Sequence, residues 1–147
     1  MLSASFFRDR ATAKRYSDDS QRERGEGCAF CALARDGGTQ VVEARQHCLI
    51  IKNRYQYDNW DNYGVIDQLM VIPRRHVEAF HKLSPEEQQD CLTAITDYEA
   101  KGYSFYGRAA SAISKSVVHQ HTHLIKIDDK QKSVMIYLRK PYFRIMS

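Results

Sequence analysis

The stretch "VVHQHTHLIKI", residues 117–127, places a histidine at every second position, at His119, His121 and His123. Branched apolar residues on both sides make this stretch typical of a β-strand. Because strand side chains alternate between two faces, all three imidazoles are expected on one face. Their Cβ atoms are then about 7 Å apart from one histidine to the next. This spacing disfavours one metal ion bound by all three and favours different roles for neighbouring histidines.

The hydrophobic pattern elsewhere predicts an α+β fold with a mainly antiparallel sheet. The pattern indicates two strands within 39–53, a buried strand that Pro73 ends, and a loop rich in aromatic, Asn and Asp residues over 54–64. Further strands are expected within 103–113 and 133–140, the second after a turn at "DDKQK".

One main helix is expected over about 85–101. Ser84 can cap it, Pro85 suits its first position, and Glu87 completes a capping box. The apolar residues Leu92, Ile95 and Tyr98 continue at helical spacing, and Gly102 can end the helix.

The 147 residues, 43% of them hydrophobic, are enough for one domain with its own core. Residues 8–27 carry eleven charges and few large apolar groups, so they form an arm, an exposed helix or a linker. We therefore predict a charged N-terminal extension over 1–27 and a folded domain over 28–147. The net charge of +4 favours anionic ligands, but the basic residues are too scattered to indicate a specific nucleic-acid partner.

Neither a membrane span nor a disulfide framework is expected. No apolar run is long enough to cross a bilayer, and four cysteines in a chain of this length do not indicate paired disulfides. Cys48 and Cys91 are expected to be core thiols. The chain is accordingly expected in a reducing compartment, the cytoplasm.

Cys28 and Cys31 form a C-x-x-C motif, which has three interpretations. It could be a redox pair, two buried thiols one helical turn apart, or half of a zinc site. The redox interpretation expects a βαβ context, which this region lacks. For the zinc interpretation, His76 and His119 are the ligands that we would add, giving a Cys₂His₂ site that leaves His121 free.

An unliganded imidazole is largely neutral at pH 7 and can act as a nucleophile. Attack on phosphorus gives a phosphoramidate, which divides one difficult displacement into two easier ones. A flanking imidazole can assist by donating a hydrogen bond to the phosphoryl oxygens or the leaving group. Alternatively, the three histidines belong to a polar, solvated strand.

The motifs "SVVHQHTHLI", "VIPRRH" and "CAFC" together resemble those of the histidine triad superfamily of nucleotidyl hydrolases and transferases, over about residues 28–127. Similarity to this family implies a histidine-triad-like fold and a covalent nucleotidyl-histidine on His121, formed at the α-phosphate of a nucleotide substrate. It implies that His119 joins the other three ligands on a structural zinc ion and that His123 binds phosphate or assists the leaving group.

The same resemblance implies substrate contacts by Ser116, which precedes the triad, and by Asn53, which follows the strand "LIIKN". Lys115 could attract an anionic substrate group. A homodimer is also possible by resemblance.

Two other functions remain open at this point. The chain could be a non-catalytic, zinc-stabilised protein that binds a nucleotide or a partner, with a vestigial triad. The substituted Ser114-Lys115 pair, where the family pattern has Gly-Gln, and the long 54–66 segment motivate this alternative. The chain could also be a metal carrier with the three triad histidines as exposed ligands.

Overall fold

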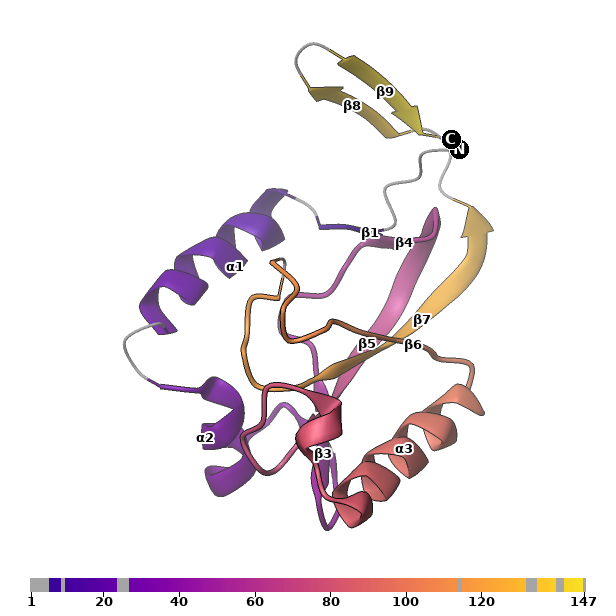
Figure 1. The fold of residues 1–147 in the computed structure, drawn as a ribbon. Helices are drawn as coiled ribbons and strands as arrows, with labels where there is room; N and C mark the ends of the chain where they lie inside the picture. The colour runs from indigo at the N-terminus through magenta and orange to yellow at the C-terminus, as the bar shows by residue number, and fades with distance from the viewer. Residues whose placement is uncertain are drawn as a thin grey trace.

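A computed structural model describes residues 6–8, 10–23, 27–113, 115–131, 135–139 and 142–146. Ser114 and three residues of the strand expected over 133–140 lie outside this part of the chain. The described residues form a mixed α+β structure whose main sheet is antiparallel, as predicted (Figure 1).

The centre of the sheet is β5, which pairs with β3 on one side and with β7 on the other. β2 extends the sheet beyond β3, β6 extends it beyond β7, and β4 with β1 adds to the beginning of β5. The strand bounds are β1 Phe6–Phe7, β2 Val41–Ala44, β3 Cys48–Lys52, β4 Asn59–Trp60, β5 Tyr63–Pro73, β6 Ser104–Gly107 and β7 Thr122–Gln131. β8 (Met135–Arg139) and β9 (Tyr142–Met146) form a separate two-stranded sheet.

Helices pack on both faces of the sheet, and each face has its own apolar cluster (Figure 1). α3 (Pro85–Glu99) covers one face, where Ile50, Val71 and Leu124 are buried against it. α2 (Ala29–Asp36) covers the other, where Phe30 packs with neighbours such as Ile51. α1 (Arg10–Glu23) lies in the charged N-terminal segment, before α2. η1 (Phe80–Lys82) is a single 3₁₀ turn before α3.

α3 begins as predicted. The Ser84 hydroxyl accepts from the Glu87 N–H, and the Glu87 carboxylate accepts from the Ser84 N–H, which is a complete capping box. The helix ends at Glu99, two residues before the expected end. Leu92 is 49% exposed rather than buried, because the helix face toward the sheet follows Cys91, Ala94, Ile95 and Tyr98.

The triad strand begins later than expected. β7 starts at Thr122, so His119 and His121 precede it. The backbone here is bonded to a neighbouring loop instead of a strand ladder, because the Gln120 N–H donates to the Val77 carbonyl at 2.6 Å. At its other end β7 continues to Gln131, through most of the segment expected to be a turn.

The segment 54–64 is not all loop. β4 and β5 form a tight hairpin through Asp61 and Asn62, whose φ angles are 51° and 69°. Two consecutive left-handed residues are the turn that suits a right-twisted hairpin, and Asp and Asn tolerate it better than most residues. β5 therefore begins at Tyr63, within the segment expected to be a loop. α2 and β9 were not predicted.

Acid should weaken the start of α3. Hydrogen bonds from Arg75, at 2.7 and 2.9 Å, and from the Ser84 N–H lower the pKa of Glu87 to about 2 from an ordinary 4.5. Because the pKa falls on folding, this contribution to stability is complete above about pH 4.5 and is lost between pH 4.5 and 2. We expect Glu87→Gln to lower Tm at pH 7 by roughly 3 °C, from about 1 kcal/mol for a weakened cap.

Thermal melts of both proteins from pH 7 to 2 check this expectation. The difference in Tm should shrink as the pH falls and should be smallest near pH 2. A constant difference across that range would contradict it.

Candidate functional site

The four predicted metal ligands lie together in the structure. The Sγ atoms of Cys28 and Cys31 and ring nitrogens of His76 and His119 all lie within 4.8 Å of one another. Cys31 Sγ is 3.1 Å from His76 Nδ1 and 3.6 Å from His119 Nδ1, and Cys28 Sγ is 3.5 Å from His119 Nδ1. Donors on a tetrahedral zinc ion are about 3.3–3.8 Å apart, given metal–ligand bonds of about 2.0–2.3 Å. This group could hold a metal ion.

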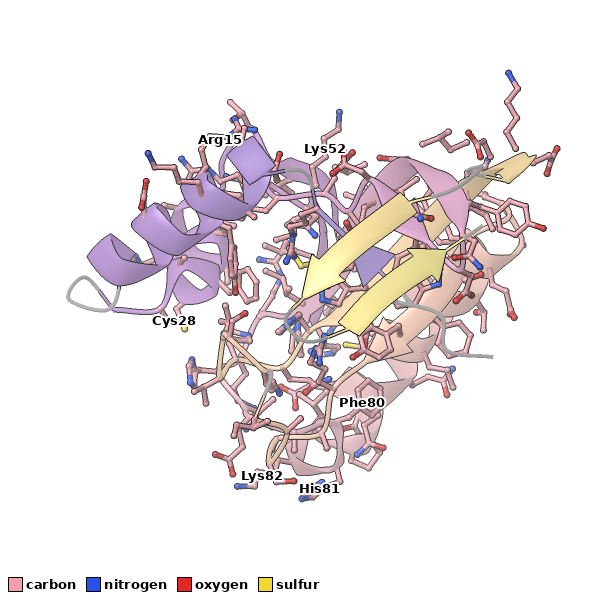
Figure 2. The ribbon with its side chains drawn as sticks, turned by 90° about the horizontal axis from the view of Figure 1, so that it is seen from above. Arg15, Cys28, Lys52, Phe80, His81 and Lys82 are labelled. Atoms are coloured by element: carbon pink, nitrogen blue, oxygen red, sulfur yellow. The ribbon has the colours of Figure 1, made fainter. Side chains whose placement is uncertain are left out.

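Three separate segments bring these ligands together. Cys28 directly precedes α2 (Figure 2) and Cys31 is in its first turn, which places both sulfurs at the same end of the helix. His76 follows β5, where Pro73 ends the strand. His119 comes from the segment before β7 and is fully buried.

The contacts around the ligands suit metal binding. His119 Nε2 is 2.9 Å from the Pro73 carbonyl oxygen, which only accepts, so the proton is on Nε2 and the Nδ1 lone pair faces the sulfurs. Metal-binding histidines usually have such a partner for their second nitrogen. Burial and the adjacent Cys28 raise the pKa of the Cys31 thiol, so a thiolate at Cys31 is favoured only when a cation lies beside it.

His121 does not belong to this group. Its Nδ1 donates to the His119 carbonyl oxygen at 2.8 Å, which leaves the lone pair of the neutral ring on Nε2. Burial lowers the pKa of His121, and its side chain is 7% exposed. Phe30 contacts both rings edge-on, with centroids 5.7 Å from His119 and 5.5 Å from His121. The structure therefore separates a histidine that could bind a metal ion from a neighbour whose Nε2 has no hydrogen-bond partner among the described residues.

His123 lies beside His121, with ring centroids 5.1 Å apart. It is in β7 opposite Met70 of β5 and Tyr106 of β6, and the Tyr106 ring stacks on it at 6.0 Å. Burial, followed by the positive charges near it, lowers its pKa to about 3. His123 Nδ1 lies 3.2 Å from Nε2 of the fully buried Gln68.

An aromatic group continues from His123 toward the N-terminal segment. The ring centroid of Tyr57 lies 6.1 Å from that of His123. The Tyr57 ring stacks on Trp60, and the Trp60 ring also contacts that of Tyr106. The Arg8 guanidinium lies 4.3 Å from the Tyr57 ring centroid and 4.8 Å from that of Tyr16 in α1. The charged N-terminal segment thus reaches the surroundings of the triad.

The three predicted substrate-binding residues differ in their settings. Asn53 follows β3 and is 8% exposed; its Oδ1 accepts from the Tyr55 N–H, while its buried Nδ2 has no hydrogen-bond partner within the described residues. Ser116 is exposed. Lys115 Nζ donates to the Glu78 carbonyl oxygen and to Gln120 Oε1, so it joins the loop before the triad to the loop after β5.

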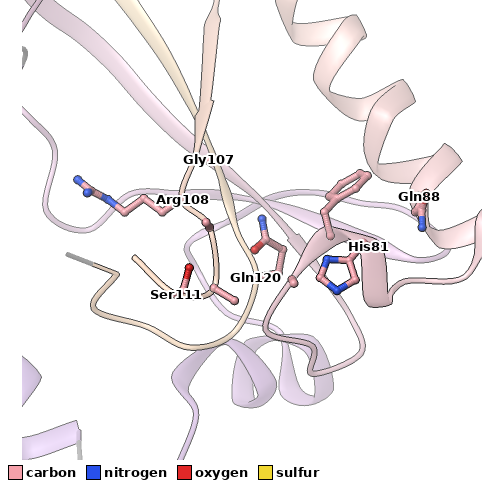
Figure 3. A pocket seen from close by; sticks show the side chains of 10 residues that line it. His81, Gln88, Gly107, Arg108, Ser111 and Gln120 are labelled. Atoms are coloured by element: carbon pink, nitrogen blue, oxygen red, sulfur yellow. The ribbon is translucent and has the colours of Figure 1, made fainter. Parts of the chain in front are cut away.

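A cavity of about 670 Å³ lies beside the segment that follows β6 (Figure 3). Its lining includes His81, Gln88, Arg108, Ser111 and Gln120 and none of the predicted site residues. Gln120 alternates with the triad histidines along the chain.

Sequence reasoning did not assign roles to Gln68, Tyr57 and Tyr106. A polar Gln68 at the head of the apolar run "LMVIP" was an available signal, since buried polar side chains need partners. Nothing local in the sequence pairs Tyr57 or Tyr106 with the triad, because both contacts depend on how the strands pair.

Within the described residues, no helix combines the length and apolar character needed to cross a membrane.

No protein-family model and no curated protein sequence matches this chain. Several solved structures, however, are similar to it. A HIT family hydrolase from Clostridium thermocellum is 21% identical, covers 71% of this chain and 93% of its own, and has a TM-score of 0.52. A HIT family protein from Bacillus anthracis is 17% identical, with coverages of 78% and 84% and a TM-score of 0.56. A hypothetical histidine triad nucleotide-binding protein from Sulfolobus tokodaii is 16% identical, with coverages of 71% and 71% and a TM-score of 0.55.

These likenesses confirm the fold that the motifs predicted. These neighbours are described as HIT family or histidine triad proteins, and this chain shares their α+β fold. This chain has the fold of the histidine triad proteins.

Proposed function

We propose that this protein is a nucleotidyl hydrolase or transferase that acts through a covalent intermediate on His121. The observation that carries the proposal is the division of labour between adjacent histidines. His119 faces two sulfurs with Nδ1, whereas His121 has its Nδ1 proton engaged and its Nε2 lone pair available. The fold shared with a HIT family hydrolase and a histidine triad nucleotide-binding protein agrees with this class of reaction.

In the first step the His121 Nε2 lone pair attacks the α-phosphorus of a nucleotide substrate. The new N–P bond forms as the bond from phosphorus to the leaving group breaks, and the leaving group keeps that electron pair. Water or another hydroxyl then attacks the same phosphorus. The N–P bond breaks, His121 recovers its lone pair, and the acceptor's proton passes to solvent.

His123 assists from the adjacent position. Its ring centroid is 5.1 Å from that of His121, so a substrate bound at His121 lies within its reach. Hydrogen bonds to phosphoryl oxygens in a buried setting stabilise the charge that develops there. The segment before the triad is proposed to contact the phosphate as well, through Ser116 and Lys115.

We propose that the metal is zinc and that its role is structural. Two thiolates and two imidazoles are a donor set that zinc prefers, and four protein ligands close its coordination shell. Zinc bound there contributes folding free energy by joining α2 to the ends of β5 and β7, and it leaves the phosphoryl chemistry to the protein's side chains.

Asn53 is proposed to bind the nucleoside, because its buried Nδ2 donor has no partner within the described residues. Asn53→Asp keeps the acceptor for the Tyr55 N–H but replaces the donor with an acceptor. We expect this variant to raise the Kd for a nucleoside monophosphate by roughly 10-fold, which corresponds to one lost hydrogen bond of about 1.4 kcal/mol. Calorimetric titration measures the change. An unchanged Kd would show that Nδ2 does not contact the nucleotide.

A screen of substrates tests the proposed function. Nucleoside phosphoramidates, dinucleoside polyphosphates and nucleotide sugars should be tried, and a nucleoside monophosphate should appear as a product of at least one. Tight nucleotide binding without any product over prolonged incubation would instead support the non-catalytic alternative.

We also propose that the protein works in the cytoplasm, where Cys28 and Cys31 stay reduced for metal binding. The division between residues 1–27 and 28–147 and the possible homodimer stay predictions.

A further inference from the structure

Gln68 connects the backbone of the 54–58 segment to the third triad histidine. Its side chain is fully buried in β5. Its Oε1 accepts from the Tyr57 N–H at 2.8 Å, and its Nε2 lies 3.2 Å from His123 Nδ1. A buried amide with both ends engaged has one orientation available to it.

The Tyr57 contact determines which way the amide faces. A backbone N–H is only a donor, so the end of the amide beside it is the carbonyl oxygen, and the end beside His123 is the NH₂ group. The NH₂ group in turn is only a donor, so His123 Nδ1 accepts. The proton of the neutral His123 ring is therefore on Nε2.

The charges around His123 also favour the neutral ring. The groups that act on it are His121 from the segment before β7, Arg8 from the segment before α1 and Arg108 from the segment after β6, all of which are neutral or positive. The rings of Tyr57 and Tyr106 also pack against the His123 ring. Burial is the largest influence, and the pKa of His123 falls to about 3. The ring stays neutral across the whole physiological range.

The two histidines therefore have opposite tautomers. The His119 carbonyl holds the proton of His121 on Nδ1, which leaves Nε2 as an acceptor. Gln68 holds the proton of His123 on Nε2, which makes that atom a donor. One ring thus offers a nucleophile, and its neighbour offers a hydrogen bond.

We infer that Gln68 is a positioning residue that fixes His123 as a neutral hydrogen-bond donor, and that it thereby restricts the enzyme to nucleotides joined through a phosphoric anhydride rather than a phosphoramidate. The inference rests on the proposed function and names the substrate class for the same site.

The chemistry of leaving groups connects the tautomer to the substrate. A neutral imidazole that lost its Nε2 proton would become an imidazolate, so His123 stabilises a leaving oxygen without transferring a proton to it. When a P–O bond of an anhydride breaks, the departing phosphate keeps the electron pair as a stable anion. When a P–N bond breaks, the departing amine needs a proton first, and a cationic general acid is what supplies one.

Gln68→Glu reverses the polarity of this contact at nearly constant volume. The carboxylate still accepts from the Tyr57 N–H but presents an acceptor to His123 Nδ1. A carboxylate at that position raises the pKa of His123 and makes the ring a cation that can protonate an amine. Gln68→Met is the matched control, because it keeps the length of the side chain and loses both hydrogen bonds.

The expected kinetics separate these variants. The wild type should prefer a dinucleoside polyphosphate over a nucleoside phosphoramidate by roughly 100-fold in kcat/KM, the lower range of a general-acid contribution. Gln68→Glu should shift that ratio toward the phosphoramidate by about 10-fold or more and should lose phosphoramidate activity as the pH rises through the new pKa of His123. Gln68→Met should lower both activities without changing the ratio. A wild type that prefers the phosphoramidate, or a ratio unchanged in Gln68→Glu, would overturn the inference.

Ring ¹⁵N NMR of the full-length protein tests the tautomer without any turnover, and it decides the matter even if Gln68→Glu does not fold. His123, assigned by comparison with His123→Asn, should show a bare Nδ1 and a protonated Nε2 at every pH from 5 to 8. A protonated Nδ1 at pH 7 would overturn the role of Gln68. The expected spectrum together with no turnover of any substrate would refute the proposed function and the substrate class while supporting the positioning role.

Discussion

His121→Asn should lower kcat/KM for the best nucleotide substrate by roughly 10⁴-fold or more, as expected when a covalent nucleophile is removed. Asparagine can still donate to the His119 carbonyl oxygen from about the position of Nδ1, so the local backbone keeps its contact. What the variant lacks is the Nε2 lone pair. Steady-state kinetics, together with a thermal melt that shows an intact fold, measure the effect.

His81→Asn is the matched control, because His81 is an exposed histidine outside the triad and the metal group. It should keep turnover close to that of the wild type. Turnover by His121→Asn within 10-fold of the wild type would show that His121 is not the nucleophile.

Loss of the metal should have the largest effect on stability. The four residues join α2 to the segment after β5 and the segment before β7, next to the apolar contacts that Phe30, Leu33 and Ala34 make with the sheet. Removing zinc by chelation should lower the stability by about 4 kcal/mol or more, the range typical of a lost metal site. For a chain of this length that is a fall in Tm of roughly 10 °C.

A pair of histidine variants separates metal binding from general destabilisation. His76→Asn removes one ligand from an exposed position and should abolish stoichiometric zinc, measured by elemental analysis after dialysis. His81→Asn, also exposed and five residues away, should retain one zinc per chain. Equal zinc content in the two variants, or several exchangeable ions per chain, would contradict the closed four-ligand site and would favour a metal carrier.

The fold was largely predictable because its main signals are local. The capping box at Ser84 and Glu87 and the apolar runs of β3 and β5 depend on near neighbours in the sequence, and the structure has them where they were expected. The expected start of the triad strand was wrong because tertiary contacts decided it. The Gln120 N–H bonds to the Val77 carbonyl, so the strand ladder begins only at Thr122.

The composition of the metal group was predictable from residue type and motif, since cysteine sulfurs and histidine nitrogens are ligands that zinc prefers. The tautomers of His119, His121 and His123 were not predictable from the sequence. They depend on the Pro73 carbonyl, the His119 carbonyl and the Gln68 amide, each of which is brought to its histidine by strand pairing or by a bend in the chain. No sequence periodicity encodes those contacts.

The most direct test of the account is to find where the nucleotide becomes attached. The protein is mixed with a slow nucleotide substrate, quenched under alkaline conditions that preserve a P–N bond, digested, and analysed by mass spectrometry. A nucleoside monophosphate adduct is expected on His121 and none on His119 or His123. An adduct on another residue, or product formation with no adduct at any time point, would contradict it.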